Sequence, residues 1–119
     1  MRDIVLKQLS KLEPKLIILF GSYAKNNQNE NSDLDLAFLS NKKITNWQRW
    51  ELAQDLAKEL NIDVDLVDLD LADDVLRMQI VSTGEILLNK NMDSFLDRCY
   101  FNYITLNEDR WEILESYGR

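Results

Sequence analysis

The chain has 119 residues, no histidine, and a formal net charge of −7 that arises from 14 basic and 21 acidic side chains. This length favours a single domain over residues 1–119 with one active site at most. The missing histidine excludes Ser-His and Cys-His nucleophiles and histidine-containing zinc sites. The acidic balance disfavours direct nucleic-acid binding, because phosphate contacts need clustered lysines and arginines.

The sequence carries no sign of export or of membrane insertion. Its N-terminus is not a secretory signal, and no apolar segment approaches the ~18 residues that span a bilayer. The single cysteine, Cys99, has no partner for an intramolecular disulfide and is expected to be a buried thiol. We therefore expect a cytoplasmic protein that binds no membrane.

The first elements are predicted from apolar spacing and from Pro14. Residues 2–13 show the period of an amphipathic helix, which Pro14 would end. The apolar run 16–20 predicts a strand covered on both faces. Gly21 then breaks the run where a tight turn is needed, and Ser22 is expected to cap a short helix.

Two alternating segments follow and carry most of the acidic residues of interest. From residue 33 to residue 38, apolar side chains alternate with Asp33 and Asp35, which predicts a strand with one buried face and one face turned to a site. Residues 62–69 alternate in the same way and place Asp63 and Asp65 on one polar face.

The remaining segments read as helices and one short strand. Thr45 or Asn46 would cap a helix that runs to Leu60, with Trp47 and Trp50 expected in the core. Asp70 would cap a helix over about residues 72–83, which Gly84 would end, and residues 85–88 would form an edge strand. A long C-terminal helix is expected from residue 92 to about residue 117, with part of its aromatic side chains exposed: Tyr100, Phe101, Tyr103, Trp111 and Tyr117.

This order of elements predicts an α/β (α+β) domain. Helices and strands alternate along the chain and end in a helix. We expect a small mixed sheet of about four strands flanked by helices.

The spacing of the acids predicts a metal site. Asp33 and Asp35 would project side by side about 6.6 Å apart along the strand, and two such charges repel unless a cation lies between them. Magnesium prefers oxygen ligands, and a third acid on a neighbouring strand would complete a two-metal site for displacement at phosphorus. We expect Asp65 to be that acid, with Asp63 as the alternative.

The turn before these acids suits a phosphate group. Gly21 has no side chain to block an approaching triphosphate, and Ser22 offers a hydroxyl. Ser22 is expected to bind phosphate rather than to act as a nucleophile, since no base stands ready to activate it. Lys25 is either a further phosphate contact or a solvated surface residue.

Together these residues resemble a known signature. Gly21-Ser22, ten intervening residues and Asp33-Leu34-Asp35 match the pattern of the polymerase-beta nucleotidyltransferase superfamily, and residues 64–67 look like the strand that bears its third carboxylate. The resemblance covers about residues 16–88, and the short chain is similar to the minimal nucleotidyltransferases. Lys25 and Asn26 depart from the family pattern, because many relatives have arginine and glycine there.

The resemblance implies a nucleotidyltransferase fold and transfer of AMP from ATP with two Mg²⁺ ions and release of pyrophosphate. Asp33, Asp35 and Asp65 would hold the metal, while Gly21, Ser22 and Lys25 would bind the nucleotide. Similar minimal members are antitoxins that add AMP to a tyrosine of a HEPN-type ribonuclease toxin. Two alternatives stay open: neutralisation by steric binding alone, and transfer to a small molecule such as an aminoglycoside.

Overall fold

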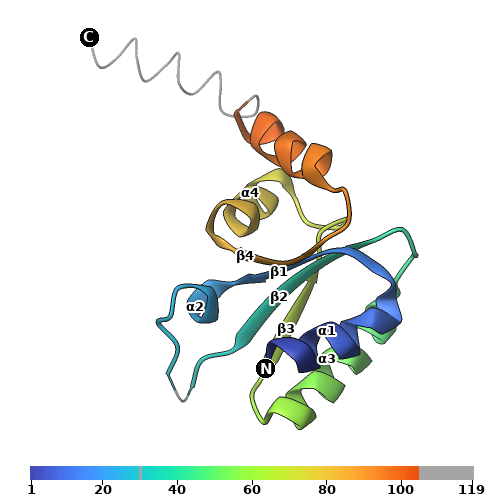
Figure 1. Cartoon of the computed structure of the whole chain (residues 1–119), viewed down its shortest axis with the longest axis vertical. Helices are drawn as coiled ribbons and strands as arrows, with labels where there is room; N and C mark the ends of the chain where they lie inside the picture. Colours follow the sequence, from blue (N-terminus) through green and yellow to red (C-terminus); the bar gives the residue numbers. More distant parts are fainter. Residues whose placement is uncertain (30, 105–119) are drawn as a thin grey trace.

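The computed structural model of the chain describes residues 1–29 and 31–104, and these form one mixed sheet between two helical layers (Figure 1). Residues 93–104 are also helical. In chain order the other elements are α1 (Arg2–Leu9), a 3₁₀ turn (Ser10–Leu12), β1 (Pro14–Phe20), α2 (Gly21–Ala24), β2 (Leu34–Ser40), α3 (Asn46–Leu60), β3 (Val64–Asp68), α4 (Asp74–Thr83) and β4 (Glu85–Asn89).

The sheet confirms the expected mixed topology. Among the described residues its strand order is β3-β2-β1-β4. β1 runs antiparallel to both β2 and β4, whereas β2 and β3 are parallel. A parallel pair needs a crossover, and α3 provides it. β4 is an edge strand, as predicted, and β3 is the edge on the other side.

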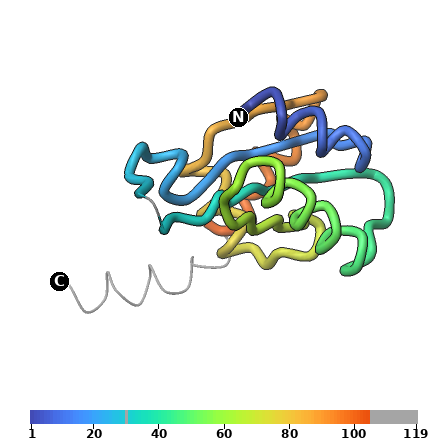
Figure 2. Tube along the Cα trace, turned by 90° about the horizontal axis from the view of Figure 1, so that it is seen from below, coloured from blue at the N-terminus to red at the C-terminus, as the bar shows by residue number. Residues whose placement is uncertain are grey.

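Each face of the sheet carries its own core (Figure 1). On one face, α1 and α3 pack side by side over residues such as Ile17, Leu36 and Leu66. On the other, α4 and the helical residues 93–104 cover residues such as Ile18 and Ala37. β1 is buried from both sides, as its apolar run predicted. Figure 2 shows α1 beside β4.

The start of α3 confirms one prediction and overturns another. The Thr45 hydroxyl accepts a hydrogen bond from the Gln48 N–H, and the Gln48 side chain accepts one from the Thr45 N–H, so the capping box closes. The expectation that Trp47 and Trp50 lie in the core is wrong. They are 64 % and 53 % exposed and stack on each other with ring centroids 5.1 Å apart.

The N-terminal cap of α4 also differs from expectation. Asp73, not Asp70, caps α4, because its carboxylate accepts from the Leu76 N–H. Asp70 instead donates its N–H to Asp68 in the turn that follows β3. Gly84 ends α4 as predicted, yet its backbone is not left-handed; a Cβ there would lie 2.3 Å from Ile18 Cγ2.

The C-terminal segment is helical as far as residue 104. Cys99 is buried, as expected, whereas Phe101 and Ile104 are exposed. The predictions for residues 105–117, including Trp111 and Tyr117, lie outside the described residues. Within the described ranges no helix is both long and apolar enough to cross a membrane.

Candidate active site

Three neighbouring strands bring Phe20, Asp35 and Asp65 into one row. Phe20, the last residue of β1, pairs with Asp35 of β2, and Asp35 pairs in parallel register with Asp65 of β3. Neighbouring strands lie about 4.8 Å apart, so the row from the β1 end to Asp65 spans roughly 10 Å. Residues paired in register point to the same face of a sheet, which here is the face covered by α4.

Gly21 stands at the start of this row in a backbone conformation that only glycine adopts easily. Its φ is +72°, and a Cβ built on it would lie 2.2 Å from Asp35 Oδ2. Glycine is therefore required here twice, for the turn and for the approach of the Asp35 carboxylate. The sequence predicted the turn but not this contact.

The rest of the turn differs in detail from its prediction. α2 already begins at Gly21, Phe20 is its N-cap, and no side chain caps it, so the expectation that Ser22 is the cap is wrong. The half-buried Ser22 keeps its hydroxyl for other contacts. Lys25 follows α2 with an exposed side chain, and its N–H donates to the Gly21 carbonyl at 3.3 Å.

Burial and two neighbouring acids perturb the Asp35 carboxyl. Partial burial raises its pKa most, and the charges of Asp65 and then Asp33 raise it further. Asp33 is exposed just before β2, and Asp65 is exposed on β3. Asp35 is therefore partly buried and lies near enough to Asp65 and Asp33 to feel their charges.

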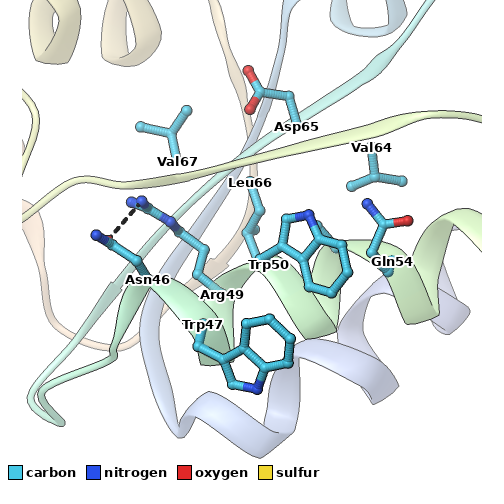
Figure 3. A pocket seen from close by; sticks show the side chains of 10 residues that line it. Asn46, Trp47, Arg49, Trp50, Gln54, Val64, Asp65, Leu66 and Val67 are labelled. Atoms are coloured by element: carbon cyan, nitrogen blue, oxygen red, sulfur yellow. Dashed lines mark hydrogen bonds between the residues drawn. The ribbon is translucent and has the colours of Figure 1, made fainter.

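Asp65, unlike Asp63, is paired with Asp35 in the sheet. Asp65 lies in β3, level with Asp35, and Figure 3 shows its side chain on the side of the strand away from α3. Asp63 precedes β3, where its carbonyl accepts the Leu34 N–H at 2.8 Å. Asp63 is not among the charges that raise the pKa of Asp35.

The open part of this face is smaller than the alternating pattern predicted. Beyond Asp35, the residues of β2 on the same face are Ala37 and Leu39, and both are buried under α4 and the helical residues 93–104. The site is confined to the end of the sheet where Asp35 is half-buried.

The chemistry of the donors suits a hard cation such as Mg²⁺. Carboxylate oxygens are its usual protein ligands, and a cation would offset the repulsion that raises the pKa of Asp35. In the described part of the chain no three acidic or cysteine side chains converge closely enough to hold an ion by themselves. Magnesium commonly completes its shell with substrate phosphates and water, so an incomplete protein shell is compatible with it.

One feature next to the site was not predicted from the sequence. A pocket of about 740 Å³ lies between α3 and the edge strand β3, and Asp65 belongs to its lining with its side chain turned away from α3 (Figure 3). α3 lines it with Trp47, Arg49, Trp50 and Gln54. The available signal was the position of the two tryptophans, which lie off the stripe of buried residues on α3: Leu52, Ala53 and Leu56.

Comparison with known proteins assigns the family. The model for "Polymerase beta, Nucleotidyltransferase" matches residues 5–93. The chain belongs to this family. The matched range includes Gly21, Asp35 and Asp65.

Individual relatives extend the likeness over nearly the whole chain. The protein adenylyltransferase MntA of Shewanella oneidensis is 42 % identical over 116 residues, which cover 94 % of this chain and 84 % of that protein. A crystal structure of a toxin–antitoxin pair with AMP-PNP contains a chain that is 39 % identical, with a TM-score of 0.84 and coverage of 99 % and 98 %.

A further structure shows a modified partner. It contains the tri-AMPylated HEPN toxin of Shewanella oneidensis in complex with its MNT antitoxin. The matching chain is 37 % identical, with a TM-score of 0.76 and coverage of 99 % of this chain and 96 % of that chain.

Proposed function

We propose that this nucleotidyltransferase moves AMP from ATP to a hydroxyl group of a HEPN-type toxin and so acts as its antitoxin. The observation that carries the proposal is the row of Gly21, Asp35 and Asp65 at one end of the sheet. It offers an open approach for phosphate beside clustered carboxylates. The relatives that are named as an adenylyltransferase and as partners of toxins support a protein as the acceptor.

In this reaction Asp33 and Asp35 would hold Mg²⁺, with Asp65 as the third ligand. Bound magnesium would neutralise the charge that develops on the phosphate oxygens. Gly21 and Ser22 would hold the β- and γ-phosphates, and Lys25 would add a positive charge nearby. Two ions in all would match the two-metal chemistry of in-line displacement at phosphorus.

The proposed reaction is a displacement at the α-phosphorus of ATP. The acceptor oxygen attacks the α-phosphorus, the bond from that phosphorus to the bridging oxygen breaks, and pyrophosphate leaves with the bonding electrons. The acceptor proton passes to the carboxylate of Asp65 as general base. A tyrosine is our choice of acceptor, because its phenolic hydroxyl is more acidic than the aliphatic hydroxyls of serine and threonine.

Alanine at both Asp33 and Asp35 tests this mechanism. Incubation of a purified HEPN-type toxin with ATP, magnesium and the wild-type chain should add AMP, which mass spectrometry measures as a mass increase. The double variant should leave the toxin unmodified while its circular dichroism stays that of the wild type. Full modification by the double variant would refute the assignment of these carboxylates.

A second candidate function is neutralisation by binding alone. The exposed Phe101 and Ile104 on the C-terminal helix favour a protein interface, since exposed aromatic residues are enriched there. Expression of the same double variant with the toxin separates the two candidates. Continued protection of the cells would favour binding, whereas loss of protection with an intact complex would favour catalysis.

A further inference from the structure

We propose that the pocket of Trp47 and Trp50, together with the free edge of β3, is the docking site for an extended segment of the acceptor protein. This inference rests on the proposed function and specifies how the protein acceptor reaches the site. The segment would add a strand beside β3 and bring its hydroxyl to Asp65.

The order of the strands indicates that the acceptor approaches from the β3 edge of the sheet. Displacement at phosphorus is in line, so the attacking oxygen enters opposite the leaving pyrophosphate. The turn at Gly21, which would hold the leaving phosphates, lies at the end of β1, and Asp35 follows on β2. Asp65 on β3 comes next, and the pocket lies along this same edge strand, between it and α3. The acceptor therefore approaches across the outer edge of β3.

The outer edge of β3 offers backbone groups to which such a segment could bond. The Asp63 carbonyl and the Leu69 N–H both bond to β2, at 2.8 and 2.9 Å. Because alternate residues of a strand turn their backbone groups to opposite sides, Val64 and Leu66 present their N–H and C=O groups outward. No strand of the described chain lies beyond β3. An added strand would satisfy these groups, as in other peptides that extend a sheet.

The pocket beside this edge supplies side-chain contacts. Trp47 and Trp50 form an exposed stacked pair, and Val64 and Val67 add apolar surface. Arg49, held by its hydrogen bond to Asn46 at 3.0 Å, adds a positive charge at the pocket (Figure 3). Exposed tryptophans that flank an apolar hollow are frequent anchors of protein binding. The pocket thus fits an apolar or aromatic side chain of the docked segment.

An adenine ring is the competing occupant, because tryptophan also stacks on nucleobases. Phosphates held at Gly21, as proposed above, would lie at the β1 end of the row, two strands from β3, and the entering oxygen would come from the opposite, Asp65 end. We therefore assign the pocket to the acceptor. Kinetics separate the two occupants, since loss of an acceptor contact raises the KM for the toxin and loss of a base contact raises the KM for ATP.

The first test compares two substitutions of exposed apolar residues. Trp47→Ala combined with Trp50→Ala removes the pocket wall, and Ile86→Ala is the control on β4, at the opposite edge of the sheet, with 41 % exposure. We expect the KM for a purified HEPN-type toxin to rise about tenfold or more in the tryptophan variant, with unchanged kcat and KM for ATP. An unchanged KM for the toxin, or a rise only in the KM for ATP, would overturn the proposal.

The second test needs no catalysis. In the complex of the Asp35→Asn variant with the toxin, hydrogen exchange at the Val64 and Leu66 amides should slow at least about tenfold. The Asp65 and Val67 amides face β2 and should change little. Unchanged exchange at Val64 and Leu66 in a formed complex would refute strand addition. Absence of AMP transfer by the wild type would instead refute the proposed function, and the exchange result would still decide the docking site.

Discussion

Gly21 and Asp35 share one small volume: a Cβ on Gly21 would lie 2.2 Å from Asp35 Oδ2. The phosphate turn and the central carboxylate are therefore built against each other, although they come from different strands. The same glycine has a φ of +72°. The position of the Asp35 carboxylate therefore depends on the absence of a side chain at Gly21.

The first prediction concerns Gly21→Ala. The new methyl group would strain the backbone by about 1 kcal/mol or more and push the Asp35 carboxylate away. A displacement of that kind typically costs about 100-fold in rate, so AMP transfer should drop by roughly that factor. A steady-state assay with the toxin measures it, and thermal unfolding reports the smaller loss of stability.

Gly84→Ala is the matched control for this substitution. Its Cβ would collide with Ile18 Cγ2 in the core, and Ile18 pairs with Ala37 rather than with Asp35. We expect a larger fall in Tm than for Gly21→Ala and near-normal activity below that Tm. Equal losses of activity in both variants would show that Gly21 acts only through folding.

The second prediction concerns stability and pH. The pKa of Asp35 is raised in the folded chain, so the folded state holds this proton more tightly than the unfolded state. In metal-free buffer, the contribution of Asp35 to stability therefore falls as pH rises from about 4 through the folded pKa. The charged carboxylate remains a penalty at neutral pH.

Asp35→Asn removes that penalty. At pH 7 with a chelator present, the variant should melt slightly above the wild type, and the difference should vanish near pH 4. Asp63→Asn should show no such pattern, because Asp63 does not perturb Asp35. Addition of Mg²⁺ should raise the Tm of the wild type and leave the Asp35→Asn variant less affected. A lower Tm for Asp35→Asn at pH 7 would contradict the assignment of its charge as unfavourable.

The third prediction separates the two candidate bases. Asp65→Asn keeps the size of the side chain but removes the proton acceptor, so kcat should fall about 100- to 10,000-fold. Asp63→Asn, two residues earlier and outside β3, should stay within about twofold of the wild type. A large loss in the Asp63 variant alone would reverse our choice of the third carboxylate.

Local patterns in the sequence predicted the elements well. The capping box joins Thr45 and Gln48, which are three residues apart, so it depends only on the local sequence. The burial of residues 16–20 also follows from their own composition. The glycine turn and the two aspartates flank one loop, so the sequence alone indicated that they lie near each other, and their roles stay predictions.

Features that depend on packing between distant segments could not be predicted in this way. The burial of Ala37 and Leu39 is caused by α4 and the helical residues 93–104, which the period of two in β2 does not include. Trp47 and Trp50 were expected in the core because of their size, yet Leu52 and Leu56 occupy the face of α3 that meets the sheet. The pairing of Asp35 with Asp65 likewise depends on how α3 connects β2 to the parallel strand β3.

The last prediction concerns Lys25, which the sequence left open between phosphate contact and surface residue. Its exposed side chain follows α2 directly, within reach of a triphosphate bound at Gly21. If it binds phosphate, Lys25→Ala should raise the KM for ATP roughly fivefold with little change in kcat, because an exposed ion pair contributes up to about 1 kcal/mol. The effect should shrink at high salt. Lys7→Ala, an equally exposed substitution on α1, is the control, and equal KM values in both variants would make Lys25 a surface residue.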